Sequence, residues 1–482
     1  MTTRTSAHTV LQSLRQGRLP GWVAVIAGVV AAFLWLTWAS PSWWVPIRAE
    51  DLNQPRLDVA PAAPRPDNPL VQTFVSVHNG LEIIEVTLAR TGTGDGSGGT
   101  FSLQLHDDAG ALIAGQQWRN AQLRHNQTLQ LDLTPQAGSA GRRYTLTVEG
   151  NEANVFSAWS YSLDVYAGGA LAGGAGAAEL QFTTRYRLLP AGVLHALARL
   201  VREGAQLIAL LALLLLLPGT VVLLLAGRTL PRFDPAAWLA LAMTLGAVFW
   251  PLLWQWTTLL GLRWRQGSVL ALLVALALLA VGLAWRRPPR LAPLRSHHLL
   301  LLLLLLLALA VRLLAVRDLA FPPWVDSSRH ALITRLMAER GQMPDDYLPY
   351  LNVSRTLYHY GFHTISASLA LLGDWPLARL LLLTGQALGA AVPLALYGGA
   401  WMATRRPAAA LLAAFLVAFP FHFPAYYATW GRFTQLTGVL VLSMLLMLTW
   451  QLLRGARRWH RAWPLVALLA AASCGDKVDP LQ

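Results

Sequence analysis

Long apolar runs, separated by short arginine-rich segments, fill the second half of the chain and predict membrane-spanning helices. Each run approaches or exceeds the roughly 20 residues needed to cross a bilayer. The runs expected to cross are residues 205–226, 236–260, 268–285, 299–316, 377–402, 408–427 and 434–453, followed by an incomplete run from Trp463. An earlier apolar run, residues 21–38, ends near Trp43 and Trp44. Its length and these interfacial tryptophans favour an uncleaved anchor over residues 21–45, after a cytoplasmic N-terminus of residues 1–20.

Between residues 71 and 187 the apolar positions instead repeat every second residue. Alternating runs occupy residues 84–88, 101–105, 129–133, 144–148 and 159–165, and some are separated by glycine-rich turns. This period predicts an antiparallel β-sandwich in which each sheet has one solvent-facing surface. The proline-rich residues 46–70 predict a stiff, extended linker before it. The expected fold is an α-helical polytopic membrane protein with an inserted extracytoplasmic antiparallel β-sandwich domain.

Composition agrees with a membrane protein. The chain of 482 residues is 55% hydrophobic and only 13% charged, whereas soluble domains carry about 25% charged residues. A net charge of +14 would suggest a nucleic-acid partner in a soluble protein. Here the arginines cluster between apolar runs, where positive charge fixes membrane orientation, so we expect membrane lipid as a partner and no nucleic acid.

The last nine residues differ from the rest in composition. Lys477 is the only lysine and Cys474 the only cysteine, and both follow an apolar run that has barely begun. We expect residues 474–482 to be a non-native tail on a C-terminally truncated chain.

The arginine clusters also predict which loops face the cytoplasm. Arg228 and Arg232 follow the first run of the bundle, and a further cluster lies within residues 286–295. Placing both in the cytoplasm leaves the β-sandwich and the loop at residues 318–375 outside a bacterial cytoplasmic membrane, with the N-terminus inside. Residues 358–372 are too short to cross and are expected to lie on, or dip into, the outer surface.

Charged residues and histidines concentrate in the external loop. A helical pattern runs from Asp326 to Arg340, with an apolar stripe of Leu332, Ile333, Leu336 and Met337, and it ends at Gly341. Asp326 is interpreted either as a helix N-cap or as a general base that takes a proton from an acceptor hydroxyl or amine. The two roles are compatible, because a capped carboxylate is rigid.

Several cations near this acid are candidates for binding a phosphate group. They are Arg329, His330, Arg335, Arg355, His359, His363 and Arg432. A guanidinium group binds phosphate with two parallel hydrogen bonds, although contact with lipid headgroups is the simpler explanation for any single arginine. His359 and His363 could also hold a divalent metal, but no third ligand follows at a defined spacing. Asp345 and Asp346 are a second choice for base or metal ligand.

Three segments of this region together resemble a known class of enzymes. VDSSRHALITRLMAERG, YHYGFHTISASLALLG and WPLARLLLL are similar to segments of the GT-C class of polytopic membrane glycosyltransferases, which includes protein O-mannosyltransferases and aminoarabinose transferases. The resemblance covers residues 299–473 as a partial core. It implies a polyprenyl-phosphate or polyprenyl-diphosphate sugar as donor and Asp326 as the base. Many members have two adjacent acids where Asp326 stands alone. Four predicted spans, namely the anchor and the three helices of residues 205–285, precede the core together with the β-sandwich, which is an unusual order.

Two other classes of protein compete with a lipid-linked sugar transferase. One is a non-enzymatic envelope protein whose β-sandwich binds glycan or a protein partner, and it predicts that the isolated domain binds polysaccharide. The other is a transporter, which would carry polar residues at mid-span. The apolar runs are almost purely aliphatic, and this counts against a transporter.

Overall fold

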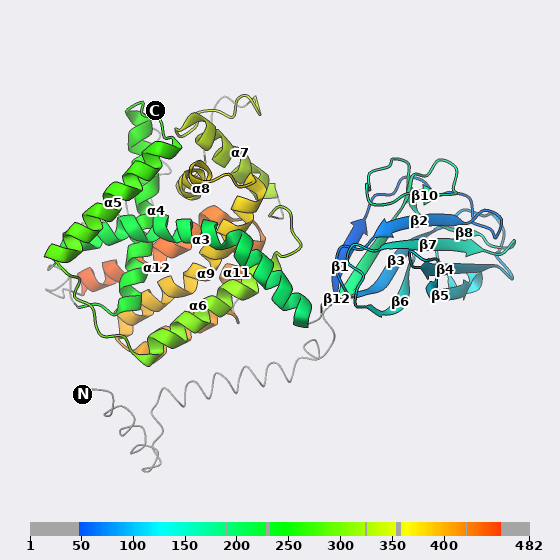
Figure 1. Ribbon diagram of the computed structural model, residues 1–482, viewed down its shortest axis with the longest axis horizontal. Helices are drawn as coiled ribbons and strands as arrows, with labels where there is room; N and C mark the ends of the chain where they lie inside the picture. The colour runs from blue at the N-terminus through cyan, green and yellow to red at the C-terminus, as the bar shows by residue number, and fades with distance from the viewer. Residues whose placement is uncertain are drawn as a thin grey trace, which may run out of the picture. The chain divides into compact units, whose positions relative to one another are not determined.

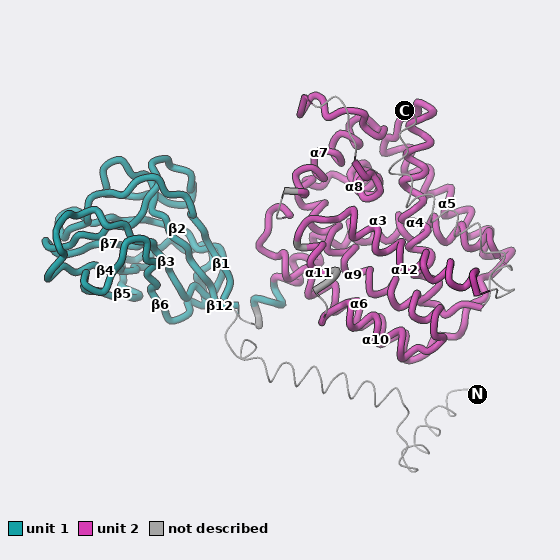
Figure 2. The backbone as a smooth tube through the Cα atoms, turned by 180° about the vertical axis from the view of Figure 1, so that it is seen from behind, with its two compact units in different colours: residues 1–195 teal, residues 196–482 magenta. Residues whose placement is uncertain are grey.

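The computed structural model describes residues 48–188, 190–227, 232–322, 325–352, 358–420 and 422–454. The predicted anchor, the incomplete run from Trp463 and the predicted non-native tail lie outside the described residues. The chain divides into two compact units, residues 1–195 and 196–482, coloured separately in Figure 2. The first contains the β-strands and the second nearly all of the helical residues.

The β unit consists of two five-stranded antiparallel sheets and a short strand pair (Figure 1). The first sheet has the order β1 (Arg48–Gln54), β12 (Phe182–Arg187), β3 (Leu81–Arg90) and β6 (Thr128–Gln136), with β8 (Phe156–Ala158) also paired to β3. The second has the order β10 (Leu171–Ala172), β2 (Leu70–Val75), β7 (Arg143–Gly150), β4 (Thr100–His106) and β5 (Leu112–Arg119). The pair joins β11 (Glu179–Leu180) to β9 (Ser160–Tyr161), and a short 3₁₀ turn, η2, covers Asn120–Gln122.

Both sheets contribute side chains to one apolar core, which confirms the predicted sandwich. Ile84 and Val86 of β3 meet Phe74 of β2 and Leu103 of β4 in this core, and all four are fully buried. Successive side chains of a strand point to opposite faces, so a period of two buries one face. The alternation predicted the strands because each sheet has only one buried face.

Two sequence predictions in this unit were wrong. The predicted linker contains β1, which pairs antiparallel with β12 from Arg48 opposite Arg187 to Gln54 opposite Phe182. The sandwich therefore begins inside the proline-rich segment. The run at residues 159–165 is not one strand, because β9 ends at Tyr161 and Leu163 is 59% exposed.

The helical unit contains ten helices within the described part of the chain. They are α3 (Pro190–Ala226), α4 (Pro235–Leu259), α5 (Gln266–Arg286), α6 (Ser296–Ala315), α7 (Val325–Arg340), α8 (Gly361–Leu372), α9 (Leu377–Thr404), α10 (Pro407–Ala418), α11 (His422–Thr429) and α12 (Phe433–Leu453). Six of them, namely α3, α4, α5, α6, α9 and α12, are long and apolar enough to cross a membrane. These six match six of the seven predicted crossings in this region.

The seventh predicted crossing, residues 408–427, is not a single helix. Helix α10 ends at Ala418, and α11 begins at His422 after a turn at Phe419 and Pro420. Proline cannot continue a helix without losing a backbone hydrogen bond. At 1.5 Å per residue, α10 is only about 18 Å long, short of the roughly 30 Å hydrocarbon core.

Helices α7 and α8 lie at one end of the bundle, beside the loop between α4 and α5 (Figure 1). The Trp264 amide donates to the Gly341 carbonyl at 2.8 Å, and the Met343 amide donates to Thr258 Oγ1 at 3.0 Å. The arginines of residues 286–295 follow α5, whose other end carries Arg265. The structure therefore separates the arginine cluster from α7 by the length of a helix.

Helices α3 and α4 pack with their backbones in contact. A Cβ atom on Gly219 would lie 1.8 Å from the Ala242 carbonyl oxygen, and one on Gly246 would lie 1.7 Å from the Leu215 carbonyl oxygen. Small residues at such positions allow apolar helices to approach closely without a hydrophobic driving force from water. Glycine is required at both places by the distance between the helices.

Candidate functional site

Two buried histidines connect α7 to α8. His330 Nδ1 lies 2.9 Å from His363 Nε2, and neither residue is exposed. Aromatic rings enclose the pair, with the rings of Tyr358, Phe362 and Phe433 centred 5.9, 5.6 and 5.6 Å from that of His330. The contact arises because His330 lies on the buried face of α7 and His363 lies in the first turn of α8.

Neighbouring groups determine which nitrogen of each neutral histidine carries the proton. The His363 Nδ1 atom lies 2.9 Å from the His359 carbonyl oxygen. A carbonyl can only accept, so this Nδ1 donates and His363 Nε2 is left as an acceptor. His330 Nδ1 then donates to His363, and His330 Nε2 keeps its lone pair. The Gly431 backbone lies close to this ring, but the buried Nε2 atom makes no hydrogen bond of normal geometry with any described residue.

Burial keeps both histidines neutral. It lowers the pKa of His330 from 6.5 to about 4, against smaller opposing effects from the Asp326 carboxylate and the Gly431 backbone. Burial, and then the neighbouring His330, lower the pKa of His363 well below 6.5. At neutral pH the pair is therefore uncharged, and the lone pair of His330 Nε2 can accept a hydrogen bond.

Asp326 faces Arg432, a residue more than 100 positions away in the sequence. Arg432 Nε lies 3.7 Å from Asp326 Oδ2, and both side chains are partly exposed, at 36% and 41%. Arg432 also covers the Trp430 ring, with Cζ 4.2 Å from the ring centre. Helix α7 begins at Val325, so Asp326 lies in its first turn, two positions after the N-cap position. A carboxylate there is still favoured by the helix dipole.

The remaining predicted cations have different surroundings. Arg329 is exposed and close enough to Tyr347 and Tyr358 to influence both. Arg335 binds Glu339 at 2.8 Å and stacks on Tyr350, so it belongs to a separate exposed group. The structure therefore places Arg329 close to Tyr347 and Tyr358 and engages Arg335 elsewhere.

Two predicted residues remain. Arg355 lies outside the described residues. His359 is exposed; its ring is centred 5.9 Å from that of Tyr358, and its carbonyl accepts from His363. The second-choice acids are also separate from the histidines, since Asp346 pairs with Arg340 at 2.6 Å and Asp345 is exposed.

Sequence analysis missed two residues beside this site. Tyr358 contacts both histidines, and burial, followed by the nearby Asp326, raises its pKa. Arg312 lies near the end of α6, is 6% exposed, and has two nitrogens, Nε and Nη2, without a hydrogen bond to any described residue. An arginine within a leucine run is a recognisable signal, because buried charges in membrane spans are costly.

The guanidinium group of Arg312, on α6, packs against α9 one helical turn beyond the point where α9 meets the aromatic rings around His330. Gly385 faces Phe433, whereas a Cβ atom on Gly389 would lie 3.3 Å from Arg312 Nη1.

The predicted metal pair His359 and His363 belongs to no three-ligand group among the described residues; the one such group there is Asp234, His297 and His298.

This arrangement places three chemical functions together: a carboxylate, a guanidinium group and a neutral imidazole with a free lone pair. Together they could accept a proton, neutralise an anion and orient a hydroxyl group. No protein-family model matches the chain, and no curated protein matches its sequence.

Proposed function

We propose that the protein is a membrane glycosyltransferase, which moves a sugar from a polyprenyl-phosphate-linked donor to an acceptor outside a bacterial cytoplasmic membrane. The observation that carries the proposal is the approach of Arg432 to Asp326, 3.7 Å apart at the end of the bundle that holds α7 and α8. A carboxylate next to a guanidinium group supplies a base and an anion-binding group in one place. The resemblance of residues 299–473 to the GT-C class supports the same reaction.

In this proposal Asp326 is the general base. The acceptor O–H or N–H bond breaks, its proton passes to the Asp326 carboxylate, and the freed electron pair attacks the anomeric carbon of the sugar. The bond from that carbon to the phosphate oxygen breaks at the same centre, and the polyprenyl phosphate leaves. Its charge is neutralised by Arg432, with Arg329 as a second cation.

The neutral histidine pair is suited to orienting the acceptor. His330 Nε2 has a free lone pair in a dry, aromatic surrounding. A hydroxyl hydrogen of the sugar or acceptor would satisfy it, and a satisfied buried acceptor is more stable than an unsatisfied one. A protonated imidazole would instead repel the arginines, so the low pKa of His330 favours this positioning role.

The test is sugar transfer by purified full-length protein in lipid nanodiscs, with a radiolabelled polyprenyl-phosphate sugar as donor. Asp326→Asn keeps the size of the side chain but removes the base, and we expect at least about a 100-fold loss of rate. Asp345→Asn is the matched control, because it removes an exposed carboxylate from the same external segment. Full activity of Asp326→Asn would exclude Asp326 as the base, whereas loss in the Asp345 variant alone would transfer the role to that acid. Wild-type protein without transfer activity towards such donors would favour the non-enzymatic envelope protein.

A further inference from the structure

A second cluster of polar side chains lies at the start of α4 and α6. Asp234 immediately precedes α4, and His297 and His298 are in the first turn of α6. Asp234 Oδ2 lies 2.8 Å from His298 Nε2 and 3.4 Å from His297 Nε2. All three ligand atoms lie within 4.8 Å of one another. Three side chains from two helices thus converge on one point.

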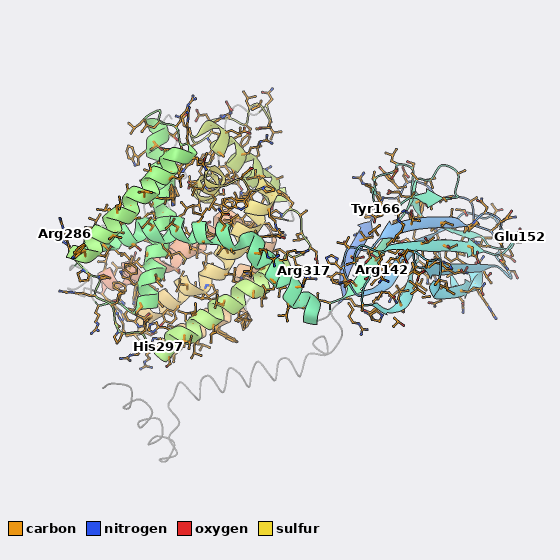
Figure 3. The ribbon with its side chains drawn as sticks, viewed as in Figure 1. Arg142, Glu152, Tyr166, Arg286, His297 and Arg317 are labelled. Carbon is orange, nitrogen blue, oxygen red and sulfur yellow. The ribbon has the colours of Figure 1, made fainter. Side chains whose placement is uncertain are left out.

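This point is away from the site at α7 and α8. Figure 3 labels His297 and Arg317, which lie at opposite ends of α6. His297 is in the first turn of that helix, while Arg317 follows its last residue on the way to α7. The cluster is therefore separate from the residues of the proposed transferase.

The backbone holds the two contributing loops together. Phe233 and Leu291 form an isolated parallel β-bridge, with the Phe233 amide donating to the Arg290 carbonyl at 3.0 Å and the Ala292 amide to the Phe233 carbonyl at 2.8 Å. Arg232 Nε donates to the Leu291 carbonyl at 3.2 Å. These bonds fix the distance between Asp234 and the histidines before any ligand arrives, and a rigid scaffold is what a precise metal site needs.

The two carboxylate oxygens of Asp234 have different hydrogen-bond partners. Oδ1 accepts hydrogen bonds from the Ala236 and Ala237 amides at 3.0 and 3.1 Å and thereby caps α4. Oδ2 faces the two imidazoles. The side chain is only 5% exposed, and the hydroxyl of Tyr397 lies close to it, buried and without a hydrogen bond of normal geometry to any described residue. The cap therefore orients a buried carboxylate oxygen towards the histidines.

Both ring nitrogens of His298 have hydrogen-bond partners. The Arg295 amide donates to His298 Nδ1 at 2.9 Å, so Nδ1 accepts and the neutral ring carries its proton on Nε2, which donates to Asp234 Oδ2 at 2.8 Å. His298 Nδ1 also lies 3.2 Å from the Arg295 carbonyl oxygen. When a metal binds Nε2, the ring proton would move to Nδ1 and be donated to this carbonyl, the arrangement that orients most metal-binding histidines.

We propose that Asp234, His297 and His298 bind a divalent transition-metal ion, with Zn²⁺ the best match. Tetrahedral zinc has ligand bonds of about 2.0–2.2 Å, so its ligand atoms lie about 3.3–3.6 Å apart. The 3.4 Å distance from Asp234 Oδ2 to His297 Nε2 fits this spacing, and the 2.8 Å hydrogen bond to His298 Nε2 would lengthen by about 0.5 Å when the ion replaces the shared proton. Two histidines and one carboxylate leave a fourth position for water or another ligand.

The donor atoms favour a transition metal over Mg²⁺ or Ca²⁺. Imidazole nitrogen suits zinc and its neighbours, whereas Mg²⁺ and Ca²⁺ prefer sets of oxygen ligands. Only one acid is present, and Arg232 and Arg295 are on the same loops. A site with so little negative charge depends on metal–nitrogen bonds more than on charge attraction. The bound ion would fasten the start of α6 to the start of α4.

The test is metal binding by full-length protein purified in detergent with an affinity tag that contains no histidine. The protein is stripped with a chelator, incubated with Zn²⁺, freed of unbound metal and analysed for zinc by mass spectrometry. We expect about one Zn²⁺ per chain, and an intense visible absorption when Co²⁺ replaces it in a four-coordinate site. Asp234→Asn keeps the helix cap, since asparagine caps as well as aspartate, but it removes the anionic ligand.

His297→Gln is a second variant that keeps the His298–Asp234 contact. We expect either variant to bind zinc at least about 100-fold more weakly than wild type. His195→Gln, which removes an exposed histidine of α3, should bind zinc normally, as should His363→Gln. Only trace zinc in the wild type, or undiminished zinc in both the Asp234 and His297 variants, would overturn the proposal.

Discussion

His330 and His363 are 33 positions apart in the sequence, yet their ring nitrogens lie 2.9 Å apart with no solvent exposure. The neighbouring contact between Thr334 and Ser366, 2.8 Å from oxygen to oxygen, repeats the connection one turn further along α7. These polar pairs fix how α7 lies on α8. They also orient the free lone pair of His330, next to the first turn that carries Asp326.

The low pKa of His330 predicts a dependence of stability on pH. The unfolded histidine binds a proton below about pH 6.5 and the folded one only below about 4, so the unfolded state binds more protons between these values. Stability should therefore be fully present above about pH 6.5 and fall as the pH drops towards 4, by up to about 3 kcal/mol from this group. His363, the Asp326 carboxylate and Tyr358 face the same ring and remain in the variant described next.

The measurement is thermal unfolding in detergent at several pH values for wild type and His330→Phe. Phenylalanine fits the aromatic surroundings of Phe362 and Phe433 but cannot be protonated. We expect the wild type to lose more stability than the variant between pH 6.5 and 4.5. Parallel pH profiles for the two proteins would show that His330 is not the titrating group.

Arg432 should matter for transfer far more than Arg335. Both arginines reach solvent near α7, but only Arg432 approaches Asp326, whereas Arg335 pairs with Glu339. Arg432→Gln should lower kcat/KM for the lipid-linked donor about 100-fold, as expected for removal of one group that stabilises a developing anion. Arg335→Gln should change it little. Equal losses of kcat/KM in the two variants would mean that both arginines act only through electrostatic attraction to the anionic lipid-linked donor, and would contradict a specific role for Arg432.

Gly246 should tolerate no side chain, because a Cβ atom there would lie 1.7 Å from the Leu215 carbonyl oxygen. Gly246→Ala must push α3 from α4, and we expect a loss of about 1–3 kcal/mol, as for other overpacked cores. Gly282→Ala in α5 is the control, because a Cβ there meets nothing within 4 Å. Alanine also favours a helix over glycine, so this variant should unfold at the same temperature as wild type or higher. Unchanged thermal stability of Gly246→Ala in detergent would contradict the close packing of the two helices.

The apolar runs were enough to predict the long helices, because the thickness of the bilayer requires roughly 20 consecutive apolar residues in each spanning helix. The helix from residue 325 to Arg340 was also predictable, since Ile333, Leu336 and Met337 recur on the face that becomes buried. Strand β1 was not, because its sequence RAEDLNQ is mostly polar and only its pairing with β12 makes it a strand. Local pattern carries no information on such a long-range pairing.

The candidate site was predictable in its residues but not in its contacts. Charges in an apolar chain identified Asp326, His330 and Arg432, whereas the pairing of His330 with His363 depends on how α8 docks. The contact between Asp234 and His298 was not predicted either, because they are 64 positions apart and only the fold brings the starts of α4 and α6 together. Arg312 could have been found, as it interrupts a leucine run.

The central claim is that Asp326 and its neighbours lie on the outer side of the membrane, and labelling of single cysteines tests it most directly. Asp345→Cys is exposed in the segment after α7, and Arg287→Cys is exposed at the end of α5; each is made with Cys474→Ser to remove the one other thiol of the chain. Intact cells are treated with a membrane-impermeant maleimide. We predict labelling of Asp345→Cys in intact cells and of Arg287→Cys only after permeabilisation. The reverse pattern would place the carboxylate in the cytoplasm and contradict the proposed function.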